Sequence, residues 1–196
     1  MIELARKRLG DSIVLYADAN GSYDASKGIE VGRMLEALKF SFFEEPCPWE
    51  ELGETKRVAD ALTMPVAVGE QDASLWRFQW MIENRVMDIV QPDLNYNGGF
   101  IRAARVARMA RKHKMNIVPH NTQTGSTAPN ILQFASAIPN SGPFMEFPWR
   151  APHKPEPWYS PQFEVKNGVV KVPTAPGLGL EIDPKFLGKS VKVDAC

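Results

Sequence analysis

Residues with acid–base or metal-binding side chains recur along this sequence, each directly after a short run rich in Val, Ile or Phe. The intervals between them are 26, 26, 23, 27 and 26 residues. This spacing equals the length of one strand, a loop, one helix and a return loop. We therefore expect about six successive βα units. Their end residues are Asp18, Glu44, Glu70, Asp93, His120 and Glu146.

The segments between the apolar runs have the period of amphipathic helices. In the first of them, apolar residues stand at i, i+3, i+4 and i+7, namely Val31, Met34, Leu35 and Leu38. Apolar strands that alternate with such helices indicate an α/β fold with a parallel sheet. That sheet is either doubly wound or closed into a barrel.

The end residues favour the barrel. Ligands of a doubly wound sheet gather at one switch point, whereas the carboxyl ends of consecutive strands converge in a (β/α)₈ barrel. The sequence has no Gly-x-Gly-x-x-Gly after the first strand and no phosphate loop. We predict an incomplete TIM-type (β/α) barrel, because only about six units are present.

The periodicity stops after Pro148, where Pro and aromatic residues become frequent. We therefore expect a partial barrel that forms the catalytic domain over residues 1–148, and a C-terminal loop, hairpin and tail over 149–196 that pack on it. Asn167-Gly168 stands between the β-formers of 163–166 and 169–172. Asn-Gly in this setting predicts a type I′ hairpin.

Charge and hydropathy narrow the choice of partner. The formal net charge is zero, with 44% apolar and 23% charged residues, so no electrostatic footprint for nucleic acid or an anionic membrane is visible. The N-terminus lacks the apolar stretch of a signal peptide, and no run is long enough to span a bilayer. We expect a cytoplasmic protein that binds a small molecule.

Three of the end residues form a candidate metal site. Asp18, Glu44 and Glu70 follow consecutive predicted strands, and no Cys or His stands among them. An all-oxygen ligand set favours a hard divalent ion, and we predict Mg²⁺. The alternative is that each carboxylate caps a helix or ends a solvated loop.

The next three end residues are candidates for proton transfer. Asp93 and His120 end neighbouring strands, so the carboxylate could orient the imidazole as a general base; a lone His is otherwise more often structural. Glu146 would face the metal across the barrel mouth and hydrogen-bond a substrate oxygen. Its alternative is a simple ion pair.

These residues stand in motifs that resemble those of a known family. The motifs are Asp18-Ala19-Asn20, Phe43-Glu44-Glu45-Pro46, Gly69-Glu70-Gln71, Pro92-Asp93 with Asn97-Gly98-Gly99, Pro119-His120 and Met145-Glu146. In order and spacing they are similar to the strand-end motifs of the mandelate racemase/muconate lactonizing enzyme family of the enolase superfamily. The resemblance selects Glu44 over Glu45 as the metal ligand.

The resemblance implies a function. A base, His120 oriented by Asp93, would remove the proton α to a carboxylate, and Mg²⁺ would stabilise the resulting enolate. Dehydration of an acid sugar and racemisation or epimerisation of a 2-hydroxy acid both follow from this step. We favour dehydration, because four polar residues near the mouth suit a polyhydroxylated substrate. They are Asn20, Asn95, Asn121 and Gln123.

The sequence departs from the family at its start. Family members have a capping domain and two barrel strands before the Asp motif, whereas few residues precede Ile13 here. We expect the chain to be a fragment of a longer, homo-oligomeric enzyme. A non-catalytic chain that only keeps the fold is the alternative. A metal-dependent hydrolase would normally use His ligands on early strands.

Overall fold

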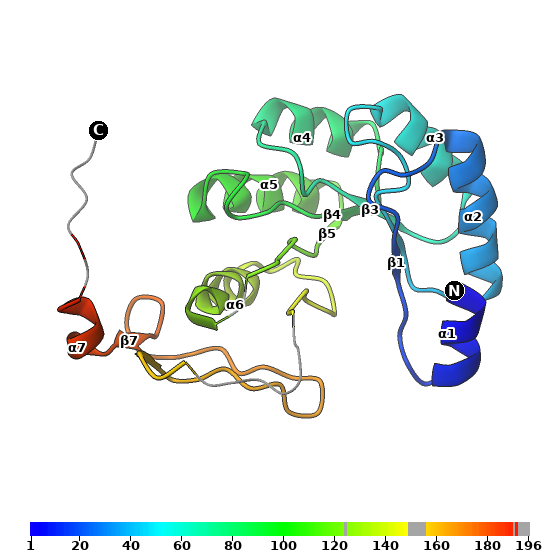
Figure 1. The fold of residues 1–196 in the computed structure, drawn as a ribbon. Coiled ribbons are helices and arrows are strands. Elements are labelled where there is room, and N and C mark those ends of the chain that lie inside the picture. The colour runs from blue at the N-terminus through cyan, green and yellow to red at the C-terminus, as the bar shows by residue number, and fades with distance from the viewer. Residues whose placement is uncertain (124, 149–155, 190, 192–196) are drawn as a thin grey trace. The chain divides into compact units, whose positions relative to one another are not determined.

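The computed structural model describes the chain except for residues 124, 149–155, 190 and 192–196. The described residues form two compact units (Figure 1). The first comprises Met1–His120 and Asn140–Phe144, and the second Asn121–Pro139 and Met145–Cys196. These units do not coincide with the two domains predicted from the sequence, 1–148 and 149–196. The predicted domain boundary stays a prediction.

A parallel sheet forms the centre of the first unit. Its strands are β1 (Ala17–Asp18), β2 (Phe43–Glu44), β3 (Val66–Val68), β4 (Ile89–Val90) and β5 (Asn116–Ile117). They pair in the order β1-β2-β3-β4-β5, each with its neighbour in the chain. Because such crossovers are right-handed, consecutive pairing sets every connecting helix on the same face of the sheet. The predicted α/β class with an incomplete barrel is thereby confirmed.

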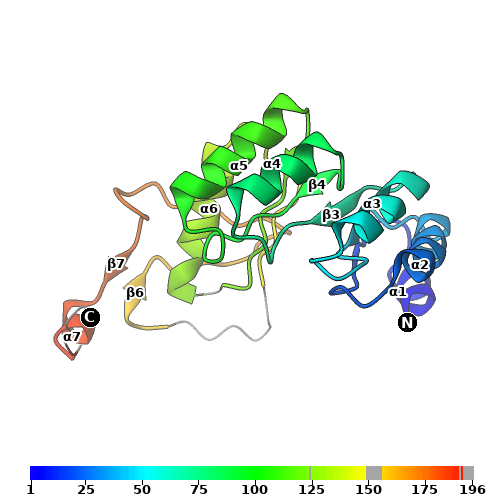
Figure 2. The same ribbon diagram turned by 90° about the horizontal axis from the view of Figure 1, so that it is seen from above.

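Four helices connect the strands of the first unit and cover one face of its sheet (Figures 1 and 2). They are α2 (Ala25–Ala37), α3 (Leu52–Ala61), α4 (Leu75–Glu83) and α5 (Phe100–Lys112). Helix α1 (Ile2–Leu9) precedes β1 and has no buried residue. Side-chain caps begin two of the connecting helices. Asp24 accepts from the Lys27 N–H at the start of α2, and Ser74 accepts from the Arg77 N–H at the start of α4. These caps satisfy donors that a helix leaves unpaired at its first turn.

The core lies between the sheet and these helices. Leu35 of α2, Val58 of α3 and Phe78 of α4 are fully buried, as are Val66 and Ala67 of β3. Strand β3 is buried along its whole length, which explains why its sequence is a continuous apolar run and does not alternate.

The sixth predicted unit requires a strand at residues 144–145, directly before Glu146, and this prediction is wrong. Among the described residues, this part of the chain pairs with β5 through a single parallel bridge, between Ile117 and Ser141. The Ile117 N–H donates to Asn140 O at 2.9 Å, and the Gly142 N–H donates to Ile117 O at 2.7 Å. Pro143 follows directly and has no N–H for a ladder, so regular pairing ends before Phe144.

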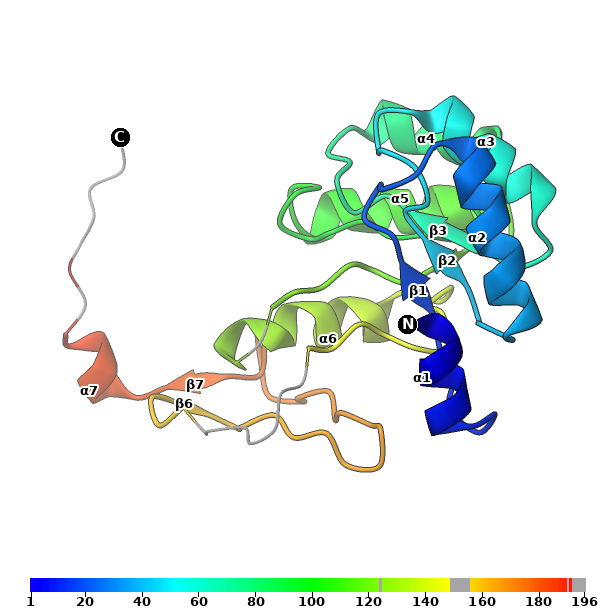
Figure 3. The same cartoon turned by 45° about the vertical axis from the view of Figure 1, so that its right-hand side comes forward.

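The second unit contains α6 (Ala128–Ala137), preceded by the 3₁₀ turn Gly125–Thr127, and a small antiparallel sheet (Figure 3). Strands β6 (Tyr159–Ser160) and β7 (Glu181–Ile182) form this sheet, which the sequence pattern did not predict. Helix α7 (Pro184–Leu187) follows, and its Phe186 ring stacks on Trp158 with centroids 4.6 Å apart.

The predicted type I′ turn is confirmed. Asn167 and Gly168 both have positive φ, of 53° and 75°, which this turn requires at its two central positions. Lys166 and Val169 exchange two backbone hydrogen bonds of 2.9 and 3.0 Å. The pairing stops at this one bridge. Among the described residues no helix is long and apolar enough to cross a membrane.

The core of the first unit yields a stability prediction. Leu35→Ala removes a side chain with 0% exposure, and large-to-small changes of this kind cost about 2 to 5 kcal/mol. Met34→Ala, one position away at 43% exposure, should change the free energy of unfolding by no more than about 0.5 kcal/mol. Urea unfolding of both variants measures the difference, and equal midpoints would contradict this description of the core.

Candidate active site

Five of the six predicted end residues lie at one edge of the five-stranded sheet. Asp18 and Glu44 end β1 and β2 and are paired in register. Glu70 follows β3 after one intervening residue, whereas Asp93 and His120 each follow their strand after two. Parallel strands present their carboxyl ends on the same side, so the side chains predicted from spacing lie along one rim.

His120 and Asp93 form the predicted pair. His120 Nδ1 lies 2.7 Å from Asp93 Oδ2, and both residues are buried. Burial by itself would raise the pKa of the Asp93 carboxyl, but hydrogen bonds from His120 and from the Tyr96 and Asn95 N–H groups lower it. Asp93 is therefore an ionised acceptor, and the proton of the neutral imidazole belongs on Nδ1.

The other nitrogen of His120 faces a predicted metal ligand. His120 Nε2 lies 3.4 Å from Glu70 Oε2, a contact longer than the bond on Nδ1. Glu70 Oε1 accepts a hydrogen bond of 3.1 Å from the Gln71 side chain. The predicted base and the predicted metal ligand thus belong to one chain of contacts, Asp93–His120–Glu70, which the spacing alone did not indicate.

Each of the three predicted metal ligands is oriented by a side-chain amide. Asn20 Nδ2 donates to Asp18 at 2.6 Å, and Gln91 donates to buried Glu44 at 2.8 Å. The third is Glu70 with Gln71. No group of three or more His, Cys, Asp or Glu is gathered around a common point within the described part of the chain. The donors fit Mg²⁺ in type, and all three stand on one rim.

Glu45, which the resemblance set aside as a ligand, is part of the same charged rim. It is buried and has a positive φ of 37°. Burial, together with the charges of Glu70 and Asp18, raises the pKa of Glu45 to about 7. The acidic groups are therefore close enough to repel one another, a condition that a bound cation would relieve.

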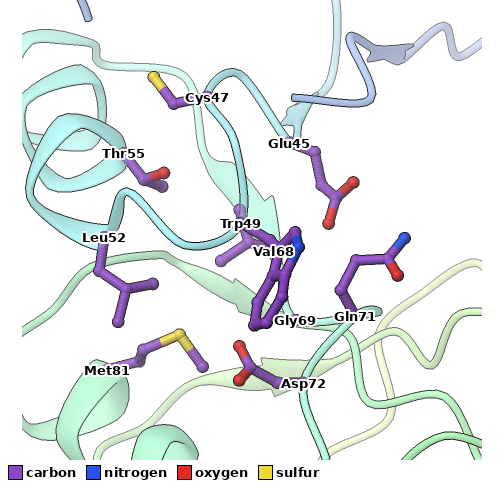
Figure 4. Close-up of a pocket in the computed structure, with 10 residues that line it drawn as sticks. All are labelled: Glu45, Cys47, Trp49, Leu52, Thr55, Val68, Gly69, Gln71, Asp72 and Met81. Carbon is purple, nitrogen blue, oxygen red and sulfur yellow. The ribbon is translucent and has the colours of Figure 1, made fainter. Parts of the chain in front are cut away.

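A small pocket opens beside this rim, between the strands β2 and β3 and the helices α3 and α4 (Figure 4). Glu45 and Gln71 both line it, with Trp49 between the polar and the apolar walls. The sequence signal that could have found Glu45 is the pair Glu44-Glu45 at the end of β2. Consecutive side chains of a strand point to opposite faces, so the two carboxylates are expected to have different surroundings.

Two further residues of the rim were missed by the sequence reasoning. Gln91 is the buried donor to Glu44. The ring of Tyr96, an exposed residue, stacks on the His120 ring with centroids 6.4 Å apart. An exposed aromatic ring next to a buried imidazole forms an apolar wall of the site.

The predicted substrate contacts divide between the two units. In the first unit, Asn20 uses its amide on Asp18, whereas Asn95 is exposed and gives its N–H to Asp93 at 2.6 Å. Their contacts with substrate stay predictions.

In the second unit, three predicted residues form one network. The Asn121 N–H donates to Glu146 Oε2 at 2.6 Å, and the Asn121 side chain donates to Glu146 O and Gln123 O, both at 3.2 Å. Gln123 returns a bond of 3.1 Å from its N–H to Asn121 Oδ1. The structure thus joins Asn121, Gln123 and Glu146 to one another, and their role toward substrate stays a prediction.

Curated relatives of this chain include two enzymes that act on sugar acids or their lactones. Arabinonate dehydratase from Saccharolobus solfataricus is 30% identical over 92% of this chain and 48% of the relative. D-galactarolactone cycloisomerase from Agrobacterium fabrum is 33% identical over 93% of this chain and 50% of the relative. The chain thus spans about half the length of the curated relatives it matches.

Solved structures share the fold. A protein from Roseobacter denitrificans is 41% identical, with a TM-score of 0.89 over 97% of this chain and 53% of that one. A mutant L-talarate/galactarate dehydratase, liganded with Mg and L-glucarate, is 26% identical, with a TM-score of 0.80 over 95% of this chain and 45% of that one.

A family model provides the remaining comparison. The model described as "Enolase C-terminal domain-like" matches residues 1–186, which include every end residue of the rim and the network around Glu146. This match covers nearly the whole chain, and the curated relatives match over more than nine-tenths of it. The chain therefore belongs to the enolase superfamily, as a C-terminal-domain member of the mandelate racemase/muconate lactonizing enzyme family.

Proposed function

We propose that this chain provides the proton-transfer and metal-binding residues of an enzyme that removes the α-proton of a carboxylate substrate through an enolate. The substrate class that we propose is an acid sugar, which the enzyme dehydrates. One observation carries the proposal: His120 lies between Asp93 on one ring nitrogen and Glu70 on the other.

The contacts of His120 define its part in the reaction. Asp93 holds the imidazole proton on Nδ1 at 2.7 Å, so Nε2 is the nitrogen positioned to receive a proton from the substrate. The imidazolium that results is stabilised by the ionised Asp93 carboxylate. Burial of both side chains limits competition from water.

Asp18, Glu44 and Glu70 would hold Mg²⁺. A bound Mg²⁺ would supply positive charge next to the substrate carboxylate and lower the free energy of its enolate form. Burial, and after it the charges of Glu70 and Asp18, raise the pKa of Glu45, and the charge contribution supports a cation at this rim. The Mg in the related L-talarate/galactarate dehydratase supports the choice of ion.

Dehydration follows when the substrate has a hydroxyl on its β-carbon. After His120 takes the α-proton, the C–O bond at the β-carbon breaks, and the protonated His120 would give its proton to the departing hydroxyl, which leaves as water. The enol product then tautomerises to a 2-keto-3-deoxy acid. Three dehydratases among the relatives support this outcome. The alternative is isomerisation, which the cycloisomerase relative supports.

The first test of this proposal is isotope exchange. With Mg²⁺ and a substrate acid in D₂O, the protein should exchange the α-proton, and His120→Asn should slow the exchange by at least about 100-fold, the usual contribution of a general base. Mass spectrometry or ¹H NMR of the substrate measures the rate. His113→Asn, at the end of α5, is the matched control, and unchanged exchange in His120→Asn would refute the role of His120.

The second test is metal affinity. Asp18→Asn, Glu44→Gln and Glu70→Gln should each weaken Mg²⁺ binding by about tenfold or more, since even the loss of a residue that supports a ligand costs that much. Titration calorimetry with Mg²⁺ alone measures the affinity. Glu30→Gln, an exposed carboxylate of α2, should bind Mg²⁺ as the unaltered chain does. Equal affinities in all four variants would exclude this ligand set.

The third test separates dehydration from isomerisation. A library of acid sugars, incubated with Mg²⁺ and the protein, should yield a 2-keto-3-deoxy product, which semicarbazide detects as a carbonyl adduct. An epimer of the starting acid with no carbonyl product would favour the isomerase. If no acid gives either product, the result would support the alternative that the chain keeps only the fold.

A further inference from the structure

Arg102, the third residue of α5, joins two loops of the active-site rim. Its Nε donates to Asn97 O at 2.7 Å, and its Nη2 donates to Ala73 O at 2.7 Å. Asn97 belongs to the loop between β4 and α5, and Ala73 to the loop between β3 and α4. One guanidinium thus links consecutive loops through their backbone carbonyls, where its planar fork fixes both direction and distance.

The same two loops carry the carboxylates that contact His120. Glu70 lies in the loop after β3, and Asp93 lies in the loop after β4. His120 contacts both, with Nε2 3.4 Å from Glu70 and Nδ1 2.7 Å from Asp93. His120 and Arg102 therefore connect the same two loops through different groups.

The link from Arg102 to Asp93 is short. The Asn97 N–H donates to Asp93 O at 2.9 Å, so the carbonyl that Arg102 binds belongs to the turn that begins at Asp93. Gly98 leaves room for the aliphatic part of the Arg102 side chain. A Cβ at position 98 would lie 2.7 Å from Arg102 Cδ, and the φ of Gly98 is +89°. A side chain at position 98 would therefore displace Arg102 and strain the backbone.

The preceding unit has the same arrangement. Arg77 is the third residue of α4, its Nε donates to Asp72 at 2.6 Å, and its Nη2 donates to Trp49 O at 2.8 Å. It thus links the loops after β2 and β3. Both arginines stand in the first turn of their helix, where side chains point toward the helix N-terminus. The loops that they join lie at that end, which explains why the arrangement recurs.

We propose that Arg102 is a positioning residue: it sets the separation of the Glu70 and Asp93 loops and thereby holds His120 in its orientation for proton transfer. The catalytic part of this inference rests on the function proposed above. Arg102 does not touch the reacting atoms, so its effect reaches them only through the two loops.

The test uses the hydrogen bond between His120 and Asp93 as its signal. A ring N–H that donates to a buried carboxylate gives a downfield ¹H resonance, which His120→Asn identifies by its loss. In Arg102→Met this resonance should shift or disappear, and amide hydrogen exchange should accelerate in both loops, residues 69–74 and 91–99. Arg102→Lys keeps the charge without the fork and should give smaller changes in the same direction.

Two controls separate positioning from general stability. Arg105→Met removes an exposed arginine of the same helix and should leave the resonance and both loops unchanged. Leu35→Ala lowers the stability of the core at a distance from the two loops and should also keep the resonance. The proposal is overturned if Arg102→Met has the same downfield resonance and the same amide hydrogen exchange in both loops as the unaltered protein. If Arg102→Met does not fold, unchanged resonance and exchange in Arg102→Lys would overturn it.

The kinetic outcome distinguishes this inference from the proposed function. If both hold, Arg102→Met lowers kcat for α-proton exchange by about tenfold or more, since a misplacement of 1 Å costs up to about 100-fold, and KM changes little. If the unaltered protein exchanges no α-proton, the proposed function fails. The resonance and the loop exchange still decide whether Arg102 positions His120.

Discussion

Parallel pairing of five consecutive short strands is the interaction on which the rest of the first unit depends. Each strand has only two or three residues, so few ladder bonds hold it, and burial supplies most of the stability of the central strands β2 and β3. Consecutive pairing then has two consequences. The connecting helices lie on one face of the sheet. The residues at the carboxyl ends of the strands lie on one rim, where Glu70 contacts the Asp93–His120 pair.

Burying several carboxylates on one rim is costly, and the local contacts show how the cost is offset at Asp93 and Glu45. Charges taken out of water need hydrogen bonds or a counter-ion. Asp93 obtains two backbone N–H donors and the imidazole, and its pKa falls. Glu45 feels mainly burial and like charges, and its pKa rises to about 7. The rim is thus partly satisfied by the chain itself and partly suited to a cation.

Short-range patterns predicted much of this arrangement. The spacing of the end residues is a property of one βα unit, and the Asn167-Gly168 turn depends only on the φ values of two residues. The strand expected at Phe144 failed because an apolar pair next to Pro143 has the composition of a strand without the N–H for its ladder. The small sheet of β6 and β7 escaped prediction because two-residue strands far apart in the chain leave no periodic signal.

Which residue types end the strands, in what order and at what interval, follows from the sequence alone, since helix and strand lengths set this interval locally. Those features were enough to predict the barrel class and five residues of its rim, but not Gln91 or Tyr96. Tertiary packing was needed to show that His120 contacts Glu70 as well as Asp93, that burial and nearby charges raise the pKa of Glu45, and that Arg102 joins two loops. These properties depend on distances between segments more than 20 residues apart, which packing fixes and which no local pattern encodes.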